Sequence, residues 1–375
     1  MLPHMRFAIR ENVLRMTPYS PGKPIDEVKR ELGLTDVVKL ASNENPLGPP
    51  PAAVRAVQEA AARMHLYPDA AAYDLRQALA RHLDVQPEQV ALGNGSDELI
   101  HMLGEVFLSG PGDTVLTGVP SFVRYDAAAH LAGSQLRQVP VDADYRLDLP
   151  AMAEALDATV RLVFVANPNN PTGTIVSDAE VRALIRRLPE GAVLVLDEAY
   201  REYAEDLPDY PDTLAMIREG MPVIGMRTFS KAYGLAGIRV GYMVGPAEIM
   251  DAFHRAREPF NVNALAQVAA IAALGDHEHL ARSKQVNREG LARMSRLADQ
   301  YGMRALDSHA NFACLEVGDG PSVFEALLRQ GVIVRSGHVV GMPSFIRVSI
   351  GTPAEMDRFE EAFRNVWTAG IPTLA

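Results

Sequence analysis

Short apolar runs alternate with helical stretches along most of the chain, beginning near residue 51. The runs fall at residues 89–92, 114–117, 135–141, 161–166, 192–197, 223–228 and 239–245. Several of them are continuously apolar instead of alternating, which is typical of strands that helices cover on both faces. The pattern therefore predicts a large α/β domain built on a mostly parallel, seven-stranded sheet with helices on each side.

The C-terminal third of the chain has a different pattern. Residues 246–305 are mainly helical, and three further β-rich runs follow at 312–317, 332–337 and 345–351, with helical stretches between and after them. This pattern predicts a smaller α+β domain. We expect the following division of the chain: an N-terminal arm at 1–48 that joins the small domain, a large domain at 49–262 and the small domain at 263–375.

Composition narrows the class of protein. The net charge of −11 argues against general nucleic-acid binding. No stretch of about 18 apolar residues is free of charges or helix breakers, and residues 1–19 have no uninterrupted apolar core, so we expect neither a membrane span nor a signal peptide. The single cysteine, Cys314, excludes an internal disulfide, and the ten histidines show no metal-ligand spacing. We expect a soluble cytoplasmic protein without a metal site.

Polar residues follow several predicted strands directly. Ligands of open α/β sheets bind outside the carboxyl ends of the strands, so these residues are candidates for a site. Ser96 and Asp97 begin a helix after a Gly-rich turn, where free N–H groups favour an anion such as phosphate, although both are also good helix caps. Asn170 lies in the rigid turn NPNNPTG. Asp197 ends an apolar strand, where a carboxylate is costly to bury without a partner.

Lys231 differs from the other four lysines because it lies between two apolar segments, after a predicted strand. A lysine in a partly apolar pocket can lose its proton and attack a carbonyl, or it can be only a counter-ion for phosphate. Arg239, at the start of the next strand, could bind the same phosphate or form a surface salt bridge. One ligand combines a phosphate, an aldehyde for the lysine and a ring nitrogen for Asp197. That ligand is pyridoxal 5′-phosphate (PLP).

Three motifs, in this order and spacing, resemble the fold-type I PLP-dependent aminotransferases: NPNNPTG, DEAY and TFSKAYGLAGIRVGY. Five further segments are similar, more closely, to the histidinol-phosphate aminotransferase family: PYSPGKPIDEVKRELGL, KLASNENPLGPP, YPDAAAYDLRQALA, GNGSDELI and FIRVSIGT. The resemblance extends from about Thr17 to about Thr352. It implies PLP as the cofactor and a homodimer with shared active sites.

The resemblance implies roles for the residues on the cofactor side. Lys231 would bind the cofactor covalently and later move a proton between the substrate Cα and C4′ of the cofactor. Asp197 would keep the ring nitrogen protonated, and Phe122 would stack on the ring. Asn170 and Tyr200 would bond the ring's O3′. The cofactor phosphate would be held by Ser96, Asp97, Thr228, Ser230 and Arg239.

The resemblance also implies roles on the substrate side. Arg347 would pair with the substrate α-carboxylate, a bidentate task that suits arginine. Arg335 and Tyr19 would contact the distal phosphate of the substrate, and Asn45 would also contact substrate. Tyr67 would reach the cofactor phosphate of the partner subunit.

The implied activity is transamination in two half-reactions. Glutamate would donate its amino group to the cofactor, and imidazole-acetol phosphate would then accept it to give L-histidinol phosphate. Two alternatives on the same scaffold remain open: an aromatic amino-acid aminotransferase, since small pocket changes can switch side-chain choice, and a threonine-phosphate decarboxylase, which is a lyase. A PLP-binding regulator is a third, which the acidic net charge disfavours.

Overall fold

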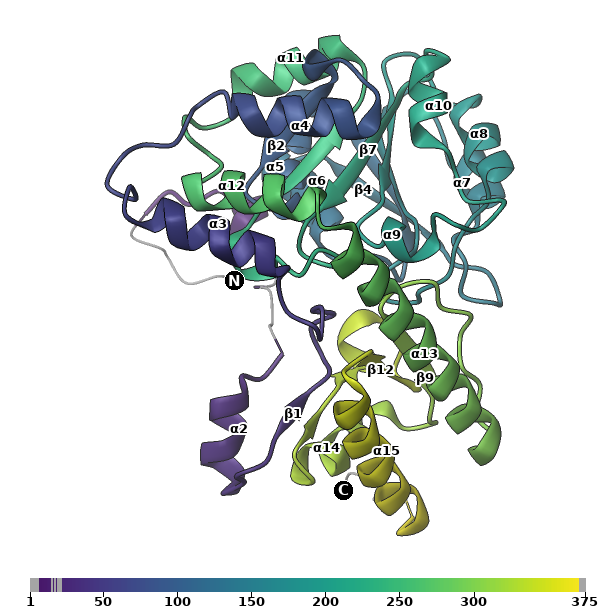
Figure 1. Ribbon diagram of the computed structural model, residues 1–375. Helices are drawn as coiled ribbons and strands as arrows, with labels where there is room; N and C mark the ends of the chain where they lie inside the picture. The colour runs from purple at the N-terminus through teal and green to yellow at the C-terminus, as the bar shows by residue number, and fades with distance from the viewer. Residues whose placement is uncertain (1–6, 15, 17, 19–21, 371–375) are drawn as a thin grey trace.

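The computed structural model describes residues 7–14, 16, 18 and 22–370. A large α/β part lies above a smaller α+β part in Figure 1, and the long helix α13 (His277–Tyr301) runs from one to the other. The predicted α/β class with a seven-stranded, mostly parallel sheet is confirmed. Among the described helices, none combines the length and the apolar character needed to cross a membrane.

The central sheet has the strand order β2-β8-β7-β6-β5-β3-β4. Its strands are β2 (Val90–Gly93), β3 (Thr114–Val119), β4 (Gln135–Pro140), β5 (Val160–Ala166), β6 (Val193–Asp197), β7 (Val223–Thr228) and β8 (Gly241–Val244). Among these strands, β8 alone runs in the direction opposite to the other six. The carboxyl ends of β5, β6 and β7 therefore meet at one edge of the sheet, and each is followed by a segment with candidate site residues.

Helices cover both faces of this sheet, which explains why several of its strands are continuously apolar. On β5, Val163 and Val165 pack into the core cluster on one face, whereas Leu162 and Phe164 pack into the cluster on the other. The first cluster includes residues of α3 (Pro51–Ala61), α4 (Tyr73–Leu83), α7 (Leu149–Glu154), α8 (Asp178–Ile185), α10 (Thr213–Arg218) and α12 (Ala264–Leu274). The second includes residues of α5 (Ser96–Phe107), α6 (Arg124–Ala132) and α11 (Ala247–Ala256).

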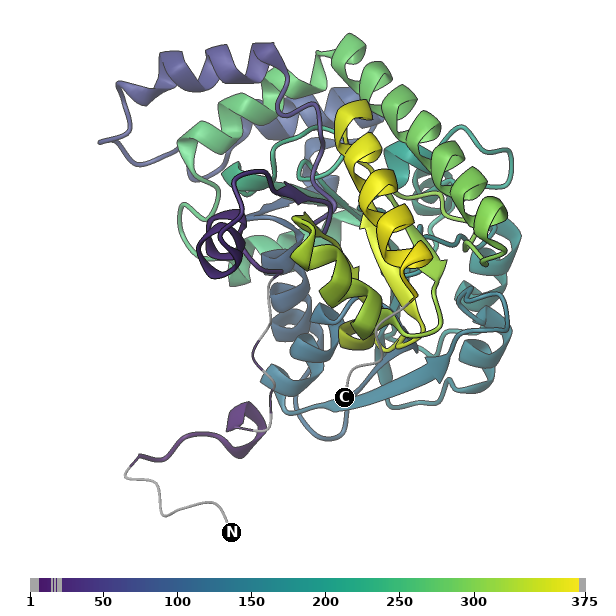
Figure 2. The ribbon, with the colours of Figure 1, turned by 90° about the horizontal axis from the view of Figure 1, so that it is seen from below.

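The smaller part has its own antiparallel sheet, in the order β11-β12-β9. Its elements are β9 (Phe312–Glu316), α14 (Gly320–Arg329), β10 (Val332–Ile333), β11 (Arg335–Ser336), β12 (Phe345–Ser349) and α15 (Pro353–Thr368). Figure 2 shows α15 between α13 and α14, and it contacts both. The N-terminal segment holds α1 (Glu11–Leu14), α2 (Ile25–Leu32) and β1 (Val38–Lys39), and β1 pairs in parallel with β10. The short α9 (Arg201–Ala204) follows β6.

Helix α12 lies beyond the predicted boundary at residue 262, yet it packs with the large part. We assigned residues from 263 onward to the small domain, yet α12 packs against α3 and α4. Its residues Ala266 and Ala269 are fully buried in the same cluster as β6 of the large sheet. The sequence of α12, ALAQVAAIAAL, is apolar on all sides, which is typical of a helix buried between other elements. The boundary at 262 stays a prediction.

Candidate active site

A cavity of about 180 Å³ lies at the carboxyl ends of β5, β6 and β7. Its walls come from the segments after these strands, the N-terminal end of α5, the start of α6 and the segment after β1. The lining residues are Ser42, Glu44, Ser96, Asp97, Phe122, Tyr125, Ala166, Pro168, Asn170, Asp197, Ala199, Tyr200, Thr228, Ser230, Lys231, Ala236 and Arg239. The structure therefore brings together every residue that we expected around the cofactor, except Tyr67.

Asp197 is the buried acid of the cavity. It ends β6, and its residue is only 5% exposed. One carboxylate oxygen, Oδ2, accepts a hydrogen bond of 2.7 Å from the Tyr125 hydroxyl, and Oδ1 accepts one of 3.1 Å from the Ala199 backbone N–H. Burial raises the pKa of Asp197 to about 6, although these two hydrogen bonds oppose the rise. A cationic group beside Asp197 would stabilise its charged form.

The N-terminal end of α5 faces the same cavity. Ser96 is the first residue of this helix, and the backbone N–H groups of the first turn of a helix have no partners within the helix. The Thr228 and Ser230 side chains line the cavity beside it, and the Thr228 hydroxyl accepts a hydrogen bond of 3.1 Å from the Ser230 N–H. Free N–H groups, hydroxyls and the positive end of the helix dipole together favour an anion here.

Arg239 completes this cradle with a guanidinium group. Its Nη1 donates a hydrogen bond of 3.4 Å to the Ser230 hydroxyl, and its Nη2 lies 3.5 Å from Oδ2 of Asp97. The guanidinium lies directly against Gly95, where a Cβ would come within 2.2 Å of Nη2. Because Gly95 also has a φ of +78°, only glycine suits this position. The GNGSDELI segment thus supplies both the helix start and the space for the arginine.

Lys231 enters the cavity from the loop after β7. Its Nζ lies 5.6 Å from the centre of the Tyr200 ring. Tyr200 itself is 3% exposed, and its hydroxyl accepts a hydrogen bond of 3.0 Å from the Asn43 amide. The Phe312 ring packs edge-on against Tyr200, at 5.4 Å between ring centres. The lysine thus faces a tyrosine that is held on two sides.

Tyr125 is a cavity residue that we missed in the sequence. Its ring stacks on Phe164 at 4.4 Å, and Phe122 packs edge-on against it at 5.7 Å. The missed signal is the short distance along the chain, since Tyr125 lies in the first turn of α6, only three residues after Phe122. Ser42 and Glu44 were also missed, although they lie in the KLASNENPLGPP segment that carried the resemblance.

Two arginines of the small sheet lie directly opposite each other, because Arg335 on β11 pairs with Arg347 on β12. Arg347 is 7% exposed and reaches the cavity wall, where its Nη1 donates a hydrogen bond of 2.6 Å to Oδ1 of Asn170. Its Nη2 donates one of 3.0 Å to the Ala41 carbonyl. Like charges directly across a strand pair destabilise a sheet, so an anion beside the two arginines would be stabilising.

Two expected residues, Asn45 and Tyr67, lie outside the cavity lining. The Asn45 amide donates hydrogen bonds of 2.8 Å to the Ala232 carbonyl and to the Ser283 hydroxyl, so in this structure it holds the segment after Lys231 and does not line the cavity. Tyr67 is 83% exposed and stacks on Phe260 at 4.7 Å, outside the cavity. Tyr19 lies outside the described residues. The roles of all three stay predictions.

The chain is similar to known proteins over nearly its whole length. The sequence model of the family "Aminotransferase class I and II" matches residues 35–363. A histidinol-phosphate aminotransferase of Moorella thermoacetica is 48% identical over 359 residues, which are 95% of this chain and 92% of that protein. One of Symbiobacterium thermophilum is 44% identical over 95% of this chain and 98% of its own. The chain therefore belongs to the class I and II aminotransferase family.

Solved structures agree with this assignment. Histidinol-phosphate aminotransferase from Sinorhizobium meliloti, in complex with pyridoxal-5′-phosphate, superimposes with a TM-score of 0.86 at 32% identity, over 96% of this chain and 98% of that one. Aspartate aminotransferase from Thermus thermophilus with maleate gives a TM-score of 0.82 at 23% identity, over 96% and 100% of the two chains. The second likeness supports the fold alone.

Proposed function

We propose that this chain is a PLP-dependent transaminase that converts imidazole-acetol phosphate and L-glutamate into L-histidinol phosphate and 2-oxoglutarate, a step of histidine biosynthesis. One observation carries the proposal: a single cavity combines Lys231, Asp197 and an anion cradle. The choice of substrate is supported by the 48% identity to a relative of that name.

The residues present fit this cofactor. The α5 N–H groups, the Ser230 hydroxyl and the Arg239 guanidinium suit a phosphate, and the glycine at position 95 keeps the arginine in place. Asp197, whose pKa burial raises to about 6, suits a protonated ring nitrogen as its neighbour. The chemistry that the bound cofactor supplies is an electrophilic carbon for the amino group and a ring that withdraws electrons from the substrate Cα.

The chain's own residues bind the cofactor and move protons. Lys231 would anchor the cofactor, and its Nζ would move the proton at the substrate Cα. Asp197 holds a proton on the ring nitrogen, and Tyr125 fixes the orientation of its carboxylate. Asn170 accepts from Arg347 through Oδ1, so its Nδ2 remains to donate to a ring oxygen. Phe122 lines the cavity, and its ring would cover one face of the cofactor.

Arg335 and Arg347 suit substrates with strong negative charge. L-histidinol phosphate carries its phosphate on the carbon next to Cα, where an amino acid has its carboxylate. Two adjacent guanidinium groups can bind such a phosphate through several hydrogen bonds, and they can bind a glutamate carboxylate in the other half-reaction. Phenylalanine offers a carboxylate and no phosphate, so this pair favours histidinol phosphate over an aromatic substrate.

We also propose that the protein acts in the cytoplasm as a homodimer whose active sites are shared. Tyr67 is the residue on which this depends, because it is 83% exposed here and forms no part of its own chain's cavity. A phosphate contact from a partner subunit's tyrosine would give this exposed ring a role. Light scattering after size-exclusion chromatography tests the dimer, and a monomer with full activity would contradict it.

Single-turnover reactions test the proposed substrate. The PLP-loaded enzyme is mixed with L-histidinol phosphate, L-phenylalanine or L-threonine phosphate, and the absorbance of the cofactor is followed. We expect conversion with the highest kcat/KM for L-histidinol phosphate, by at least about tenfold, which equals 1.4 kcal/mol. Faster conversion with phenylalanine would instead support the aromatic aminotransferase, and release of CO₂ from threonine phosphate would support the lyase.

A further inference from the structure

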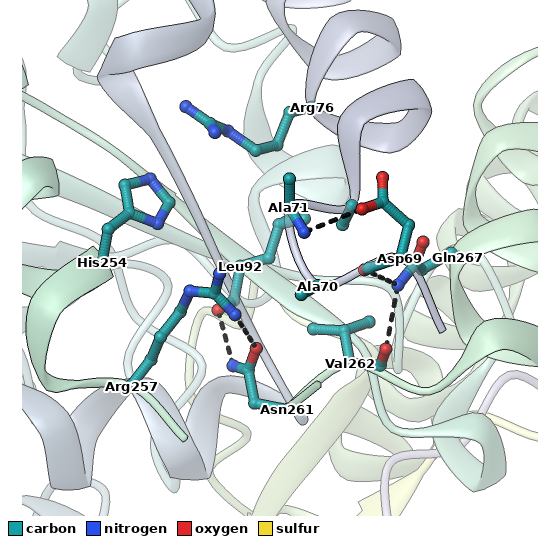
Figure 3. Close-up of a pocket in the computed structure, with 11 residues that line it drawn as sticks. Asp69, Ala70, Ala71, Arg76, Leu92, His254, Arg257, Asn261, Val262 and Gln267 are labelled. Carbon is teal, nitrogen blue, oxygen red and sulfur yellow. Dashed lines mark hydrogen bonds between the residues drawn. The ribbon is translucent and has the colours of Figure 1, made fainter. Parts of the chain in front are cut away.

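A second, much smaller crevice lies apart from the Lys231 cavity. It is bounded by the N-terminal end of α4, by β2, and by the turn that follows α11 (Figure 3). Its volume is about 10 Å³. A space of this size holds one water molecule or one small ion. The crevice shares no lining residue with the active-site cavity.

Three basic side chains line this crevice: Arg76 from α4, His254 from α11, and Arg257 from the turn. Each has one buried nitrogen without a hydrogen-bond partner, namely Nε of Arg76, Nε2 of His254 and Nε of Arg257. Other nitrogens of the two arginines are hydrogen-bonded. Arg76 Nη2 donates to the Pro87 carbonyl at 2.7 Å, and Arg257 Nη1 donates to Asn261 Oδ1 at 3.2 Å. Buried polar nitrogens are rarely left without a partner.

No carboxylate among the described residues forms an ion pair with any of these three bases. Asp69 lies at the rim, but its two oxygens accept from the Ala71 and Tyr73 backbone N–H groups at 2.9 and 2.7 Å. Burial lowers the pKa of Arg76; Glu88 opposes this effect and Arg257 adds to it. The two guanidinium groups, joined by the imidazole of His254 when it is protonated, share this crevice, and an anion between them would relieve the repulsion of their charges.

We propose that this crevice binds one small inorganic anion, of the size of chloride, through the Nε–H groups of Arg76 and Arg257 and the protonated Nε2 of His254. The small free space suits a single small anion, and the three unpartnered nitrogens all belong to side chains that line it.

The anion would be linked to the cofactor cradle by a chain of hydrogen bonds. Arg257 bonds Asn261 Oδ1, and Asn261 Nδ2 donates to Glu98 Oε2 at 2.8 Å and to the Leu92 carbonyl at 3.1 Å. The same Glu98 oxygen accepts from the Asn94 backbone N–H at 2.6 Å, in the turn that leads to Ser96. An anion that fixes Arg257 therefore also fixes the turn at the start of α5.

His254 makes the binding depend on pH. One ring nitrogen hydrogen-bonds the Val90 backbone, so Nε2 can donate to an anion only when the ring is protonated. The pKa of His254 is lowered by burial first and then by Arg76 and Arg257, whereas the Val90 bond and Asp251 oppose the shift. An anion would raise that pKa, and by linkage its affinity rises as the pH falls.

Bromide tests the site directly, because it replaces chloride and scatters anomalously. Crystals of the unmutated, PLP-loaded enzyme are soaked in sodium bromide below about pH 6, where His254 is more protonated. We expect an anomalous peak within hydrogen-bond distance of Arg76 Nε, His254 Nε2 and Arg257 Nε. Electron density for a water with no anomalous signal, or an empty crevice, would overturn the proposal.

Chloride-35 NMR tests the site in solution. Chloride that binds the PLP-loaded enzyme broadens the chloride signal, and the part of this broadening that saturates with chloride concentration measures specific binding. Arg257→Gln keeps a polar side chain and removes the charge; we expect it to weaken this binding by at least about tenfold, or 1.4 kcal/mol. Arg255→Gln is the matched control, because Arg255 lies two residues before Arg257, in the last turn of α11, is paired with Asp251 and does not line the crevice. Chloride at Arg335 and Arg347 contributes equally to both variants. Equal line widths in the two variants would contradict the proposal.

Discussion

The two sides of the active-site cavity are built in different ways. On the cofactor side, Asp197 and Thr228 end two neighbouring strands of one sheet, and the buried ion pair Arg227–Glu198 joins those strands at 2.8 Å. On the substrate side, Arg335 and Arg347 lie opposite each other as like charges on a separate, three-stranded sheet. That sheet meets the cofactor side through the hydrogen bond from Arg347 to Asn170, which is 177 residues away in the chain.

This difference suggests a division of tasks: the cofactor side carries out the chemistry, and the substrate side selects the substrate. On the cofactor side, the ion pair of Glu198 and Arg227 is buried, with side chains 0% and 2% exposed. On the substrate side, two arginines lie opposite each other, where an anionic substrate can bind both. Changes on the cofactor side should therefore slow every substrate alike, whereas changes on the substrate side should discriminate between substrates.

Lys231→Ala is expected to have the largest effect. It removes the group that moves the proton at the substrate Cα, a contribution of roughly 10⁴-fold, and both half-reactions should lose it equally. Steady-state rates with each substrate measure this, and Lys23→Ala, a change at an exposed lysine paired with Glu31, is the control. Borohydride reduction followed by peptide mapping provides an independent check, and a pyridoxyl group on another lysine would contradict the assignment.

Asp197→Asn is expected to bind the cofactor and transaminate poorly. A neutral amide cannot hold the proton on the ring nitrogen, so we expect a loss of more than about tenfold, or 1.4 kcal/mol, for all substrates. Tyr125→Phe removes only the hydrogen bond to Asp197 and should cause a smaller loss of the same kind. Turnover of the asparagine variant within tenfold of the unmutated enzyme would exclude this role for Asp197.

Arg335→Ala should affect substrates unequally. Loss of a charge-assisted hydrogen bond from a closed pocket is worth roughly 1.5–3 kcal/mol, so kcat/KM for L-histidinol phosphate should fall by about 10- to 150-fold. The glutamate half-reaction should fall less, because its carboxylates can use other donors. Arg329→Ala, an exposed change at the end of α14, removes the same charge from the small part and serves as control.

Glu202→Gln should change stability and leave activity intact. Glu202 on α9 is 4% exposed, and burial raises its pKa from the usual 4.5 to about 7. The folded state thus holds this proton more tightly than the unfolded state, and the stability this provides is complete below about pH 4.5 and is lost as the pH rises through about 7. Glutamine needs no proton. Unlike Asp197, Glu202 is not in the cavity lining, so no ligand there compensates its charge.

Denaturant unfolding at pH 5 and pH 8 measures this effect. Relative to the unmutated protein, Glu202→Gln should gain about 2.5 kcal/mol between the two pH values, from the shift in pKa. The exposed Glu59→Gln is the control. If the difference in unfolding free energy between Glu202→Gln and the unmutated protein did not change with pH, the raised pKa of the buried Glu202 carboxyl would be contradicted.

The cofactor side could be predicted from the sequence because its geometry is local. Each of Asn170, Asp197 and Lys231 follows a continuously apolar strand, and parallel strands end at one edge of a sheet. Tyr125 could have been predicted in a similar way, because it lies only three residues after Phe122.

The substrate side could not be derived in this way, because it depends on contacts between distant segments. The opposition of Arg335 and Arg347 follows from the register of β11 on β12, which neither strand specifies alone. Likewise, nothing in the KLASNENPLGPP segment indicates that the Asn45 amide binds Ala232 and Ser283. The packing of α12 on α3 is a third contact of this kind.

One measurement tests the separation of chemistry from specificity most directly. The ratio of kcat/KM for L-histidinol phosphate to kcat/KM for L-phenylalanine is determined in the unmutated enzyme, in Asp197→Asn and in Arg335→Ala. We expect the ratio to stay within about threefold in Asp197→Asn and to fall by at least about tenfold in Arg335→Ala, since only the second variant loses a phosphate contact. An equal ratio in all three proteins would contradict the role of the small sheet in reading the substrate, and it would favour the aromatic aminotransferase.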